Sequence, residues 1–356
     1  MSILQRYIGR TLTHTILLVI LLFMGIDVFI LLAGQLHSYS AGAYSIIQAI
    51  NYVLLSLPEQ LYQLFPMAAF IGVLMGMGLL DNHHELLVMR SSGVSPKQIL
   101  LMVLRAGLIL IIIATLIGEL IGPRTQHLAR VHSVMTADNG QALNTSKGLW
   151  IKEGPNFLHI ATIYSDKNIA GVSRYEFDDQ GHLRVETYAE KAYFYNKQWH
   201  LQNIEQSIIN ALGTGVASSH IDNLTWNLAI NPHLLQISQI QPDEMNLEQL
   251  KDYISFRDAN GLTGESYKIA YWHRVFQPIA TLVMIFLAVP FIFGPLRSTT
   301  NGLRALTGVI VGFSYYTLDQ MFAPMSEVWQ FPPLIAVIIP TLLFATIGAI
   351  LMWRVR

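Results

Sequence analysis

Apolar positions along the chain are gathered in six long blocks instead of being spread evenly. A helix needs about 20 apolar residues to cross the ~30 Å hydrocarbon core of a membrane. The blocks therefore predict six membrane-spanning helices, near residues 12–33, 60–80, 99–121, 273–294, 303–322 and 332–353. The first block is longer than the roughly 7–15 apolar residues of a signal peptide, so we expect an uncleaved anchor, although Ser40–Ala43 resembles a cleavage site.

The pattern changes between the third and fourth blocks. Residues 124–270 are mixed, and short stretches such as Phe157–Ile163 alternate imperfectly between apolar and polar positions. Asp178–Gly181 is typical of a turn between two strands. We predict about eight short strands, forming a β-sandwich or jelly-roll domain near 140–235.

A polar helix is expected after the strands, over Leu247–Arg257, and Asn260-Gly261 ends it. The predicted fold is an α-helical membrane protein with six transmembrane helices and an inserted all-β, jelly-roll-like domain. The predicted segments are spans one to three over 1–123 with a loop helix near 81–96, the β domain over 124–245, connecting helices over 246–272, and spans four to six over 273–356.

Composition narrows the function. Apolar residues make up 52% of the 356 residues and charged residues 13%, against about 25% charged in soluble domains. This excludes a simple cytoplasmic enzyme and a disordered chain. The net charge of −1 excludes an electrostatic nucleic-acid binder. The chain has no cysteine, so disulfides, thiolate metal sites and cysteine nucleophiles are excluded as well.

Lysine and arginine in the short loops predict the orientation, because cytoplasmic loops carry the excess of these residues. With the N-terminus in the cytoplasm, that side carries Arg6, Arg10, Arg90, Lys97, Arg297, Arg304, Arg354 and Arg356. The opposite short loops, 34–59 and 323–331, carry none. We therefore expect both termini in the cytoplasm and the β domain outside, in the periplasm of a cell with two membranes.

Nucleotide-binding and catalytic motifs are absent from the sequence. There is no G-x-x-x-x-G-K-[ST] loop, no G-x-G-x-x-G and no G-x-S-x-G, so we expect no cofactor in this chain. His83-His84-Glu85 resembles part of a zinc motif, but Val88 stands where the second histidine would follow His84.

The cytoplasmic loop contains a short amphipathic segment. Leu86, Leu87 and Met89 form an apolar stripe between Glu85 and Arg90. Gly93 suits a helix C-cap, and Pro96 suits the first turn of the next helix. A helix of this kind either lies on the membrane surface or docks into a groove of a partner, and the residues alone leave both open.

Three acids lie in or near the spans: Asp27, Glu119 and Asp319. Ionisable groups in hydrocarbon are costly and are functional candidates by default. The alternative is a carboxylate that caps a helix end or pairs between helices. Arg124 and Arg130 lie just beyond the third span, where they either bind phosphates or form a solvated face.

Several short motifs together resemble a known family. They are Arg6-Tyr7-Ile8-Gly9, Phe65-Pro66-Met67-Ala68-Ala69, Glu85-Leu86-Leu87-Val88-Met89 with Ser92-Gly93, Gly148-Leu149-Trp150-Ile151-Lys152, Phe276-Gln277-Pro278, Phe291-Ile292-Phe293-Gly294-Pro295-Leu296-Arg297 and Leu318-Asp319-Gln320. In this order, over essentially the whole chain, they resemble the LptF/LptG family of lipopolysaccharide-export permeases. The Phe-Gly-Pro-Leu-Arg run favours an LptG-type member.

The resemblance implies a non-catalytic permease subunit of an ABC transporter in the Gram-negative inner membrane. It implies an LptF-like permease as partner, and an LptB-like ATPase dimer that binds ATP and magnesium. It also implies an LptC-like periplasmic bridge protein that receives the lipopolysaccharide. The segment with Glu85, Leu86, Met89 and Arg90 would be the ATPase-coupling helix, and the first and fifth spans would form lateral gates. Membrane lipids would surround the spans, and no nucleic acid is expected.

One departure from the family pattern concerns the cargo. The lysines that similar chains carry at the outer end of the first span correspond here to Leu31, His37 and Ser38. Only His37 becomes cationic, below about its usual pKa of 6.5. Arg124, Arg130 or the partner would then supply the positive charge, and Asp27, Leu31, His37 and Asp319 complete the candidate cargo contacts.

Alternative functions remain at this point. An LptF-type role in the same complex is one. A proton-driven lipid or solute transporter would use Asp27, Glu119 and Asp319. A membrane-embedded enzyme would need a convergent acid–base or metal set.

Overall fold

The computed structural model describes residues 3–39, 46–137, 148–165, 167–178, 180–196, 198–210, 215–226, 240–259, 264–296 and 299–354. Its internal contacts divide the chain into two compact units. The membrane unit comprises Met1–Ala129 with Lys268–Arg356, and the inserted unit comprises Arg130–Tyr267. Each unit is considered by itself.

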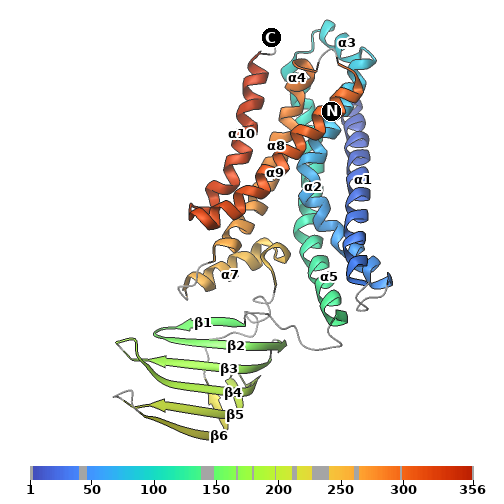
Figure 1. Ribbon diagram of the computed structural model, residues 1–356. Helices are drawn as coiled ribbons and strands as arrows, with labels where there is room; N and C mark the ends of the chain where they lie inside the picture. Colours follow the sequence, from blue (N-terminus) through green and yellow to red (C-terminus); the bar gives the residue numbers. More distant parts are fainter. Residues whose placement is uncertain are drawn as a thin grey trace. The chain divides into compact units, whose positions relative to one another are not determined.

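The membrane unit is helical throughout (Figure 1). Its elements are α1 (Ile3–Tyr39), α2 (Ile46–Asn82), α3 (Glu85–Ser91), α4 (Pro96–Leu116), the π-helix η1 (Ile117–Ile121), α5 (Gly122–Ala137), α8 (Glu265–Phe293), α9 (Asn301–Trp329) and α10 (Pro333–Arg354). Within this unit the start of α1, the short helix α3 and the end of α10 lie toward the same end, at the top of Figure 1.

Five of the described helical segments are long and apolar enough to span a membrane: Ile3–Gly34, Ile46–Asn82, Pro96–Arg130, Glu265–Phe293 and Pro333–Arg354. The remaining expected span, near 303–322, forms α9. Its 29 residues suffice in length, but Arg304 and the polar run from Ser314 to Gln320 lower its hydropathy. All six expected spans are therefore helices, and α9 is the most polar of them.

α2 is the central helix of the membrane unit. In its most apolar stretch 78% of the residues are buried, against 11% for α1. Gly72 and Gly76 let α1 pack closely, because a Cβ on Gly72 would lie 2.5 Å from the Ile16 Cα and one on Gly76 2.6 Å from the Thr15 hydroxyl. Small residues give membrane helices this close approach. α1 thus packs against α2 on one side and leaves an apolar face, including Leu21 and Phe29, exposed.

The inserted unit contains one antiparallel sheet whose six strands pair in sequence order. The strands are β1 (Leu149–Glu153), β2 (Asn156–Ser165), β3 (Asn168–Phe177), β4 (Leu183–Tyr195), β5 (Gln198–Ile209) and β6 (Val216–Trp226). The inserted all-β region is confirmed. Its described strands are longer and fewer than the eight or so expected, and they form one meandering sheet instead of two facing layers.

Kinks in the strands explain the imperfect alternation. Buried positions recur three residues apart, at Ile169 and Val172, Ala189 and Ala192, and Leu201 and Ile204. Simple alternation would place such pairs on opposite faces. Gly171 (φ 63°) and Asn203 (φ 55°) interrupt the extended backbone between two of these pairs. The Asn203 amide donates a hydrogen bond to the carboxylate of Glu190, which lies between Ala189 and Ala192. One face of the sheet therefore keeps a continuous apolar core around Trp199.

The expected turn over Asp178–Gly181 joins β3 to β4. Gly181 adopts a positive φ of 81°. The Asp178 carboxylate accepts backbone hydrogen bonds from His182 at 2.9 Å and Gln180 at 3.0 Å. The hydrogen bond from the His182 amide is the largest cause that holds the pKa of Asp178 below its usual value.

The polar helix that follows the sheet is α7 (Leu247–Ala259), preceded by the short 3₁₀ turn η2 (Pro242–Glu244). Asn246 and Gln249 cap its start reciprocally, with each side chain accepting the other's backbone N–H, at 2.8 Å and 3.1 Å. Phe256 packs on the apolar core of the sheet. The predicted helix is confirmed, and the expected break at Asn260-Gly261 lies outside the described residues.

Candidate functional site

The helix expected within the cytoplasmic loop is α3, which begins at Glu85 directly after α2. His84 precedes it in the left-handed conformation with φ 58°. Glu85 in the first turn and Arg90 in the last complement the helix dipole. Gly93, at φ 90°, donates its N–H to the Arg90 carbonyl at 3.0 Å, as expected for a C-cap glycine. The sequence therefore defines both ends of a single short helix between α2 and α4.

The apolar residues of α3 have two different surroundings. Leu86 and Met89 are buried in the core of the membrane unit. Leu87 and Val88 are 59% and 60% exposed. Of the predicted coupling residues, Leu86 and Met89 therefore anchor α3 to its own spans. The apolar surface that α3 offers to another molecule consists of Leu87 and Val88, and the sequence stripe did not distinguish the two pairs.

The charged ends of α3 contact other spans. The Tyr7 hydroxyl of α1 donates a hydrogen bond of 2.9 Å to the Glu85 Oε1. The Arg90 guanidinium lies 5.8 Å from the ring centre of Phe293, at the end of α8, within the range of a cation–π contact. α3 is therefore linked to both α1 and α8 by the residues that the sequence analysis assigned to coupling.

Glu119 belongs to a buried ionic cluster around Arg274 of α8. Arg274 donates to the Gly118 carbonyl at 2.9 Å and to Glu59 Oε1 at 3.1 Å, and its Nη1 lies 3.8 Å from Glu119 Oε2. The Tyr62 hydroxyl donates to the Arg274 carbonyl at 3.2 Å. These contacts join α2, the π-helix η1 and α8. Carbonyl groups that a π turn leaves unpaired need such donors.

Asp319 pairs with His273, the neighbour of Arg274, at 2.7 Å. Asp27 is half-buried, and among the described residues its Oδ2 accepts no hydrogen bond. Asp27 and Asp319 both lie within electrostatic range of Tyr316 on α9. The alternative of pairing between helices thus holds for Glu119 and Asp319, and Glu59, His273 and Arg274 are partners that the sequence analysis did not identify.

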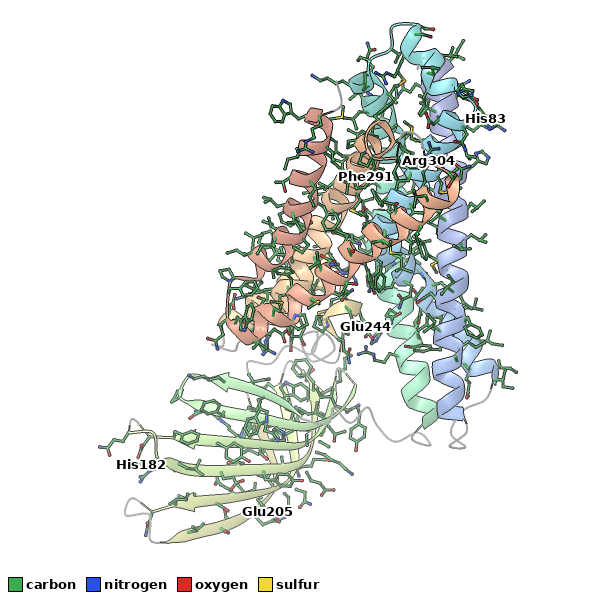
Figure 2. All side chains as sticks on the ribbon, turned by 45° about the horizontal axis from the view of Figure 1, so that its top comes forward. His83, His182, Glu205, Glu244, Phe291 and Arg304 are labelled. Atoms are coloured by element: carbon green, nitrogen blue, oxygen red, sulfur yellow. The ribbon has the colours of Figure 1, made fainter. Side chains whose placement is uncertain are left out.

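The remaining cargo candidates are dispersed. Leu31 is half-buried in α1, and Arg124 is exposed in α5. His37 falls in the last turns of α1, beyond the side chains that the structure describes. Arg130 forms an ion pair of 2.5 Å with the fully buried Glu244 and donates to the Gln241 side chain at 2.7 Å. Glu244 lies in the 3₁₀ turn before α7 (Figure 2). The Arg130 guanidinium therefore holds this turn within the inserted unit.

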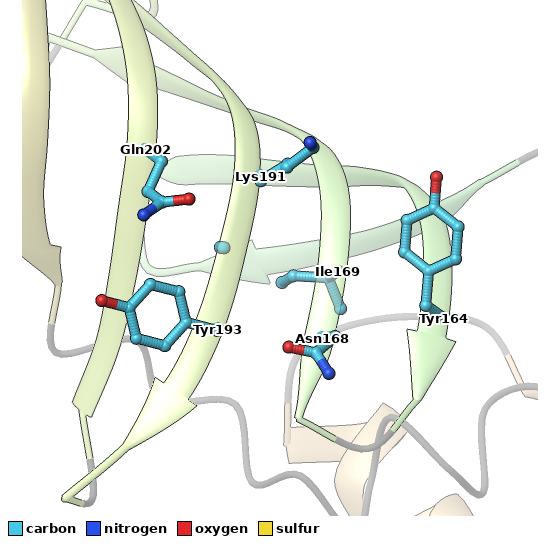
Figure 3. A pocket seen from close by; sticks show the side chains of 7 residues that line it. Tyr164, Asn168, Ile169, Lys191, Tyr193 and Gln202 are labelled. Carbon is cyan, nitrogen blue, oxygen red and sulfur yellow. The ribbon is translucent and has the colours of Figure 1, made fainter.

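A hollow of about 450 Å³ lies on the sheet of the inserted unit (Figure 3). It is lined by Tyr164, Asn168, Ile169, Lys191, Ala192, Tyr193 and Gln202. The lining combines amide, phenol and ammonium groups with the apolar side chains of Ile169 and Ala192. This volume falls within the range of small-molecule sites. No motif in the sequence pointed to it, because its lining comes from the four strands β2 to β5, which only pairing brings together.

Known proteins resemble the chain over its whole length. The family model described as "Lipopolysaccharide export system permease LptF/LptG" matches residues 6–354. The lipopolysaccharide export system permease protein LptG of Escherichia coli strain K12 is 33% identical over 355 residues, which is 99% of this chain and 98% of that protein. The LptG protein of Haemophilus influenzae is 31% identical over 343 residues, covering 96% and 95% of the two chains.

Proposed function

The chain belongs to the LptF/LptG family of lipopolysaccharide export system permeases, and from this premise we propose how its parts serve that transport. It is a multi-pass membrane permease subunit of LptG type. We propose that it lies in the Gram-negative inner membrane beside an LptF-like permease, with both termini in the cytoplasm and the inserted unit in the periplasm. The lysine and arginine asymmetry of its short loops supports this orientation.

The energy for transport is proposed to come from an LptB-like ATPase dimer that binds ATP and magnesium. Extraction of a lipid with several acyl chains costs about 0.8 kcal/mol for each CH₂ that leaves an apolar environment. The chain has no nucleotide-binding loop of its own. Lipopolysaccharide would be taken from the outer leaflet of the inner membrane and passed to an LptC-like bridge protein.

The geometry of α3 is the observation that carries this proposal. Leu86 and Met89 fix the helix to the spans, and Leu87 and Val88 face outward between Glu85 and Arg90. A partner groove that accepts an amphipathic helix would bind this outward face. A displacement of the helix by the ATPase would reach the spans directly, because the inner face is packed in their core.

Two substitutions in α3 test the docking. Glu85→Ala and Leu87→Asp in the full complex should each lower co-purification of the ATPase and the rate of ATP hydrolysis. Glu248→Ala is the control, because Glu248 is also a first-turn glutamate and is exposed at the start of α7. Tyr7→Phe removes only the bond to Glu85, so it separates that bond from the docking. Unchanged complex yield and hydrolysis in both α3 variants would remove α3 from the coupling role.

Arg124 is the better of the two arginine candidates for contact with lipopolysaccharide phosphates, since Arg130 already pairs with Glu244. Arg124→Ala should reduce photo-crosslinking of the chain to lipopolysaccharide, and Arg124→Lys should retain part of it. Lys97→Ala, an exposed cation at the start of α4, is the control. An unaltered crosslink in Arg124→Ala would leave the phosphate contact to the partner subunit.

A further inference from the structure

Arg304, near the start of α9, is the most deeply buried cationic side chain of the described residues. It is 1% exposed, and it lies in the same half of the membrane unit as the loop around His83 (Figure 2). A guanidinium is always charged and carries five fixed N–H donors. A buried arginine therefore persists only where a matching set of acceptors is built around it.

The acceptors come from the end of α2 and from the turn between α8 and α9. Arg304 Nη1 donates to the Gly78 carbonyl and to Asn82 Oδ1, both at 2.9 Å. Nε and Nη2 each donate to the Leu296 carbonyl at 3.3 Å. Nη2 also forms an ion pair with the Asp81 carboxylate. One side chain thus joins the end of α2 to the start of α9 and the turn before it, which lie far from α2 in the sequence.

Two neighbouring features fit this arrangement. The Asn82 side chain donates to Asn301 Oδ1 at 2.8 Å, which is a second bond between the end of α2 and the start of α9. A Cβ on Gly78 would lie 3.0 Å from Arg304 Cδ and 3.1 Å from Nη1. The glycine therefore leaves the space in which the guanidinium reaches the α2 carbonyl.

The acceptors on α2 lie directly before α3. Asp81 and Asn82 belong to the last turn of α2, and α3 begins at Glu85. A shift of α3 therefore acts on these residues through the chain itself, in addition to its side-chain contacts with the spans. The link from α3 to α1 is weaker, because it is one hydrogen bond between Tyr7 and Glu85, both at least partly exposed.

We propose that Arg304 is a positioning residue that makes the segment before α3 and the start of α9 move as one body. This inference rests on the proposed function, in which α3 receives the ATPase, and on the gate role that the family resemblance implies for the fifth span, α9. Arg304 would transmit the force without contacting ATP or cargo. Substitution of Arg304 should therefore uncouple the two activities, so that ATP is hydrolysed with less extraction of lipopolysaccharide.

The test uses the complete complex in liposomes, with ATP hydrolysis and lipopolysaccharide extraction measured together. Arg304→Lys keeps the positive charge but removes the planar set of N–H donors of the guanidinium. We expect the number of ATP molecules hydrolysed per lipopolysaccharide extracted to rise about 5-fold or more, as for coupling between two sites. Hydrolysis itself should stay near the wild-type rate.

Three further variants sharpen the test. Gly78→Ala displaces the guanidinium and keeps every charge, so it should raise the same ratio more weakly. Asp81→Asn should also raise it, and Arg304→Lys with Asp81→Asn should be less than additive, as for residues of one network. Gly302→Ala is the control on α9, because a Cβ there meets nothing within 4 Å.

A ratio that stays at the wild-type value in Arg304→Lys and in Gly78→Ala would overturn the proposal, even if both rates fall, because a purely structural role lowers them in parallel. If Arg304→Lys does not assemble, Gly78→Ala and Asp81→Asn decide in the same way. Failure of the proposed function gives a different result, since the wild-type complex would then lack ATP hydrolysis or extraction.

Discussion

At the scale of single residues, the membrane unit is defined by buried charges that pair across helices. Arg274 joins α8 to Glu59 of α2 and to the π turn that contains Glu119. In an apolar medium an unpaired charge is costly, so each partner depends on the others. The cluster thus fixes which faces of three helices meet.

The loss in the free energy of unfolding caused by a substitution in this cluster should depend on which groups the substitution leaves unpaired. Arg274→Met leaves two carboxylates and the Gly118 carbonyl without their cation, and we expect a loss of about 3–5 kcal/mol in the free energy of unfolding. Glu59→Gln should cost less, and Glu119→Gln least, because Glu119 is 25% exposed and lies 3.8 Å away. Thermal unfolding of the detergent-solubilised protein measures the order. Equal losses in all three variants would contradict the assignment.

The sequence revealed Asp27, Glu119 and Asp319 because a charge within an apolar block stands out. It did not reveal Glu59 and Arg274, which lie at the edges of their blocks and looked like loop or boundary residues. Their pairing depends on how α2, the π-helix η1 and α8 pack together. The sequence of any one of these helices does not show that packing. The coupling roles assigned to Glu85 and Arg90 remain predictions. The burial of Leu86 and Met89 against the spans could not be predicted from the sequence, because it depends on how α3 packs.

At the scale of elements, the kinked strands depart most from a simple pattern. A strand that keeps one face buried across a kink needs a residue that tolerates the left-handed conformation. Gly171 in β3 and Asn203 in β5 are such residues. The turn at Asp178–Gly181 and the helix α7 were predictable, because both depend on local residues. The π turn was not, since a single extra residue in a helical turn has no periodic signature.

Asn203 offers a test of the kink. Asn203→Val should lower the free energy of unfolding of the full chain by about 1–2 kcal/mol relative to Asn203→Gly, since a β-branched residue disfavours a positive φ. Both variants lose the hydrogen bond to Glu190, so the difference between them reports the backbone alone. Thermal midpoints in detergent provide the comparison. Equal midpoints would mean that the strand adopts another conformation at this position.

At the scale of the whole molecule, the order of helices and strands followed from the hydropathy blocks, because a membrane imposes a length on every span. The sheet region of the inserted unit was predictable as all-β. Its single meandering sheet was not, because strand count and layering depend on kinks and on pairing. The polar residues of α9 are explained only by its neighbours, because Arg304 pairs with Asp81 of α2 and Asp319 pairs with His273 of α8.

The orientation of the molecule can be measured with introduced cysteines, because the natural chain has none. Leu87→Cys on α3 and Tyr195→Cys at the end of β4 are both exposed positions. In cells with a permeabilised outer membrane, a maleimide that cannot cross the inner membrane should label position 195. Position 87 should react only after the inner membrane is broken. The reverse pattern would invert the proposed orientation.

The π turn at Ile117–Ile121 also affects how the sequence can change with time. A π turn contains one residue more than an α-turn and leaves carbonyl groups without a partner inside the helix. Deleting one residue of this turn would restore a regular α-helix and would remove the free Gly118 carbonyl that accepts the hydrogen bond from Arg274. A substitution there alters one side chain, whereas a change in length removes the acceptor itself. Selection should therefore preserve the length of this segment more strictly than the identity of its residues.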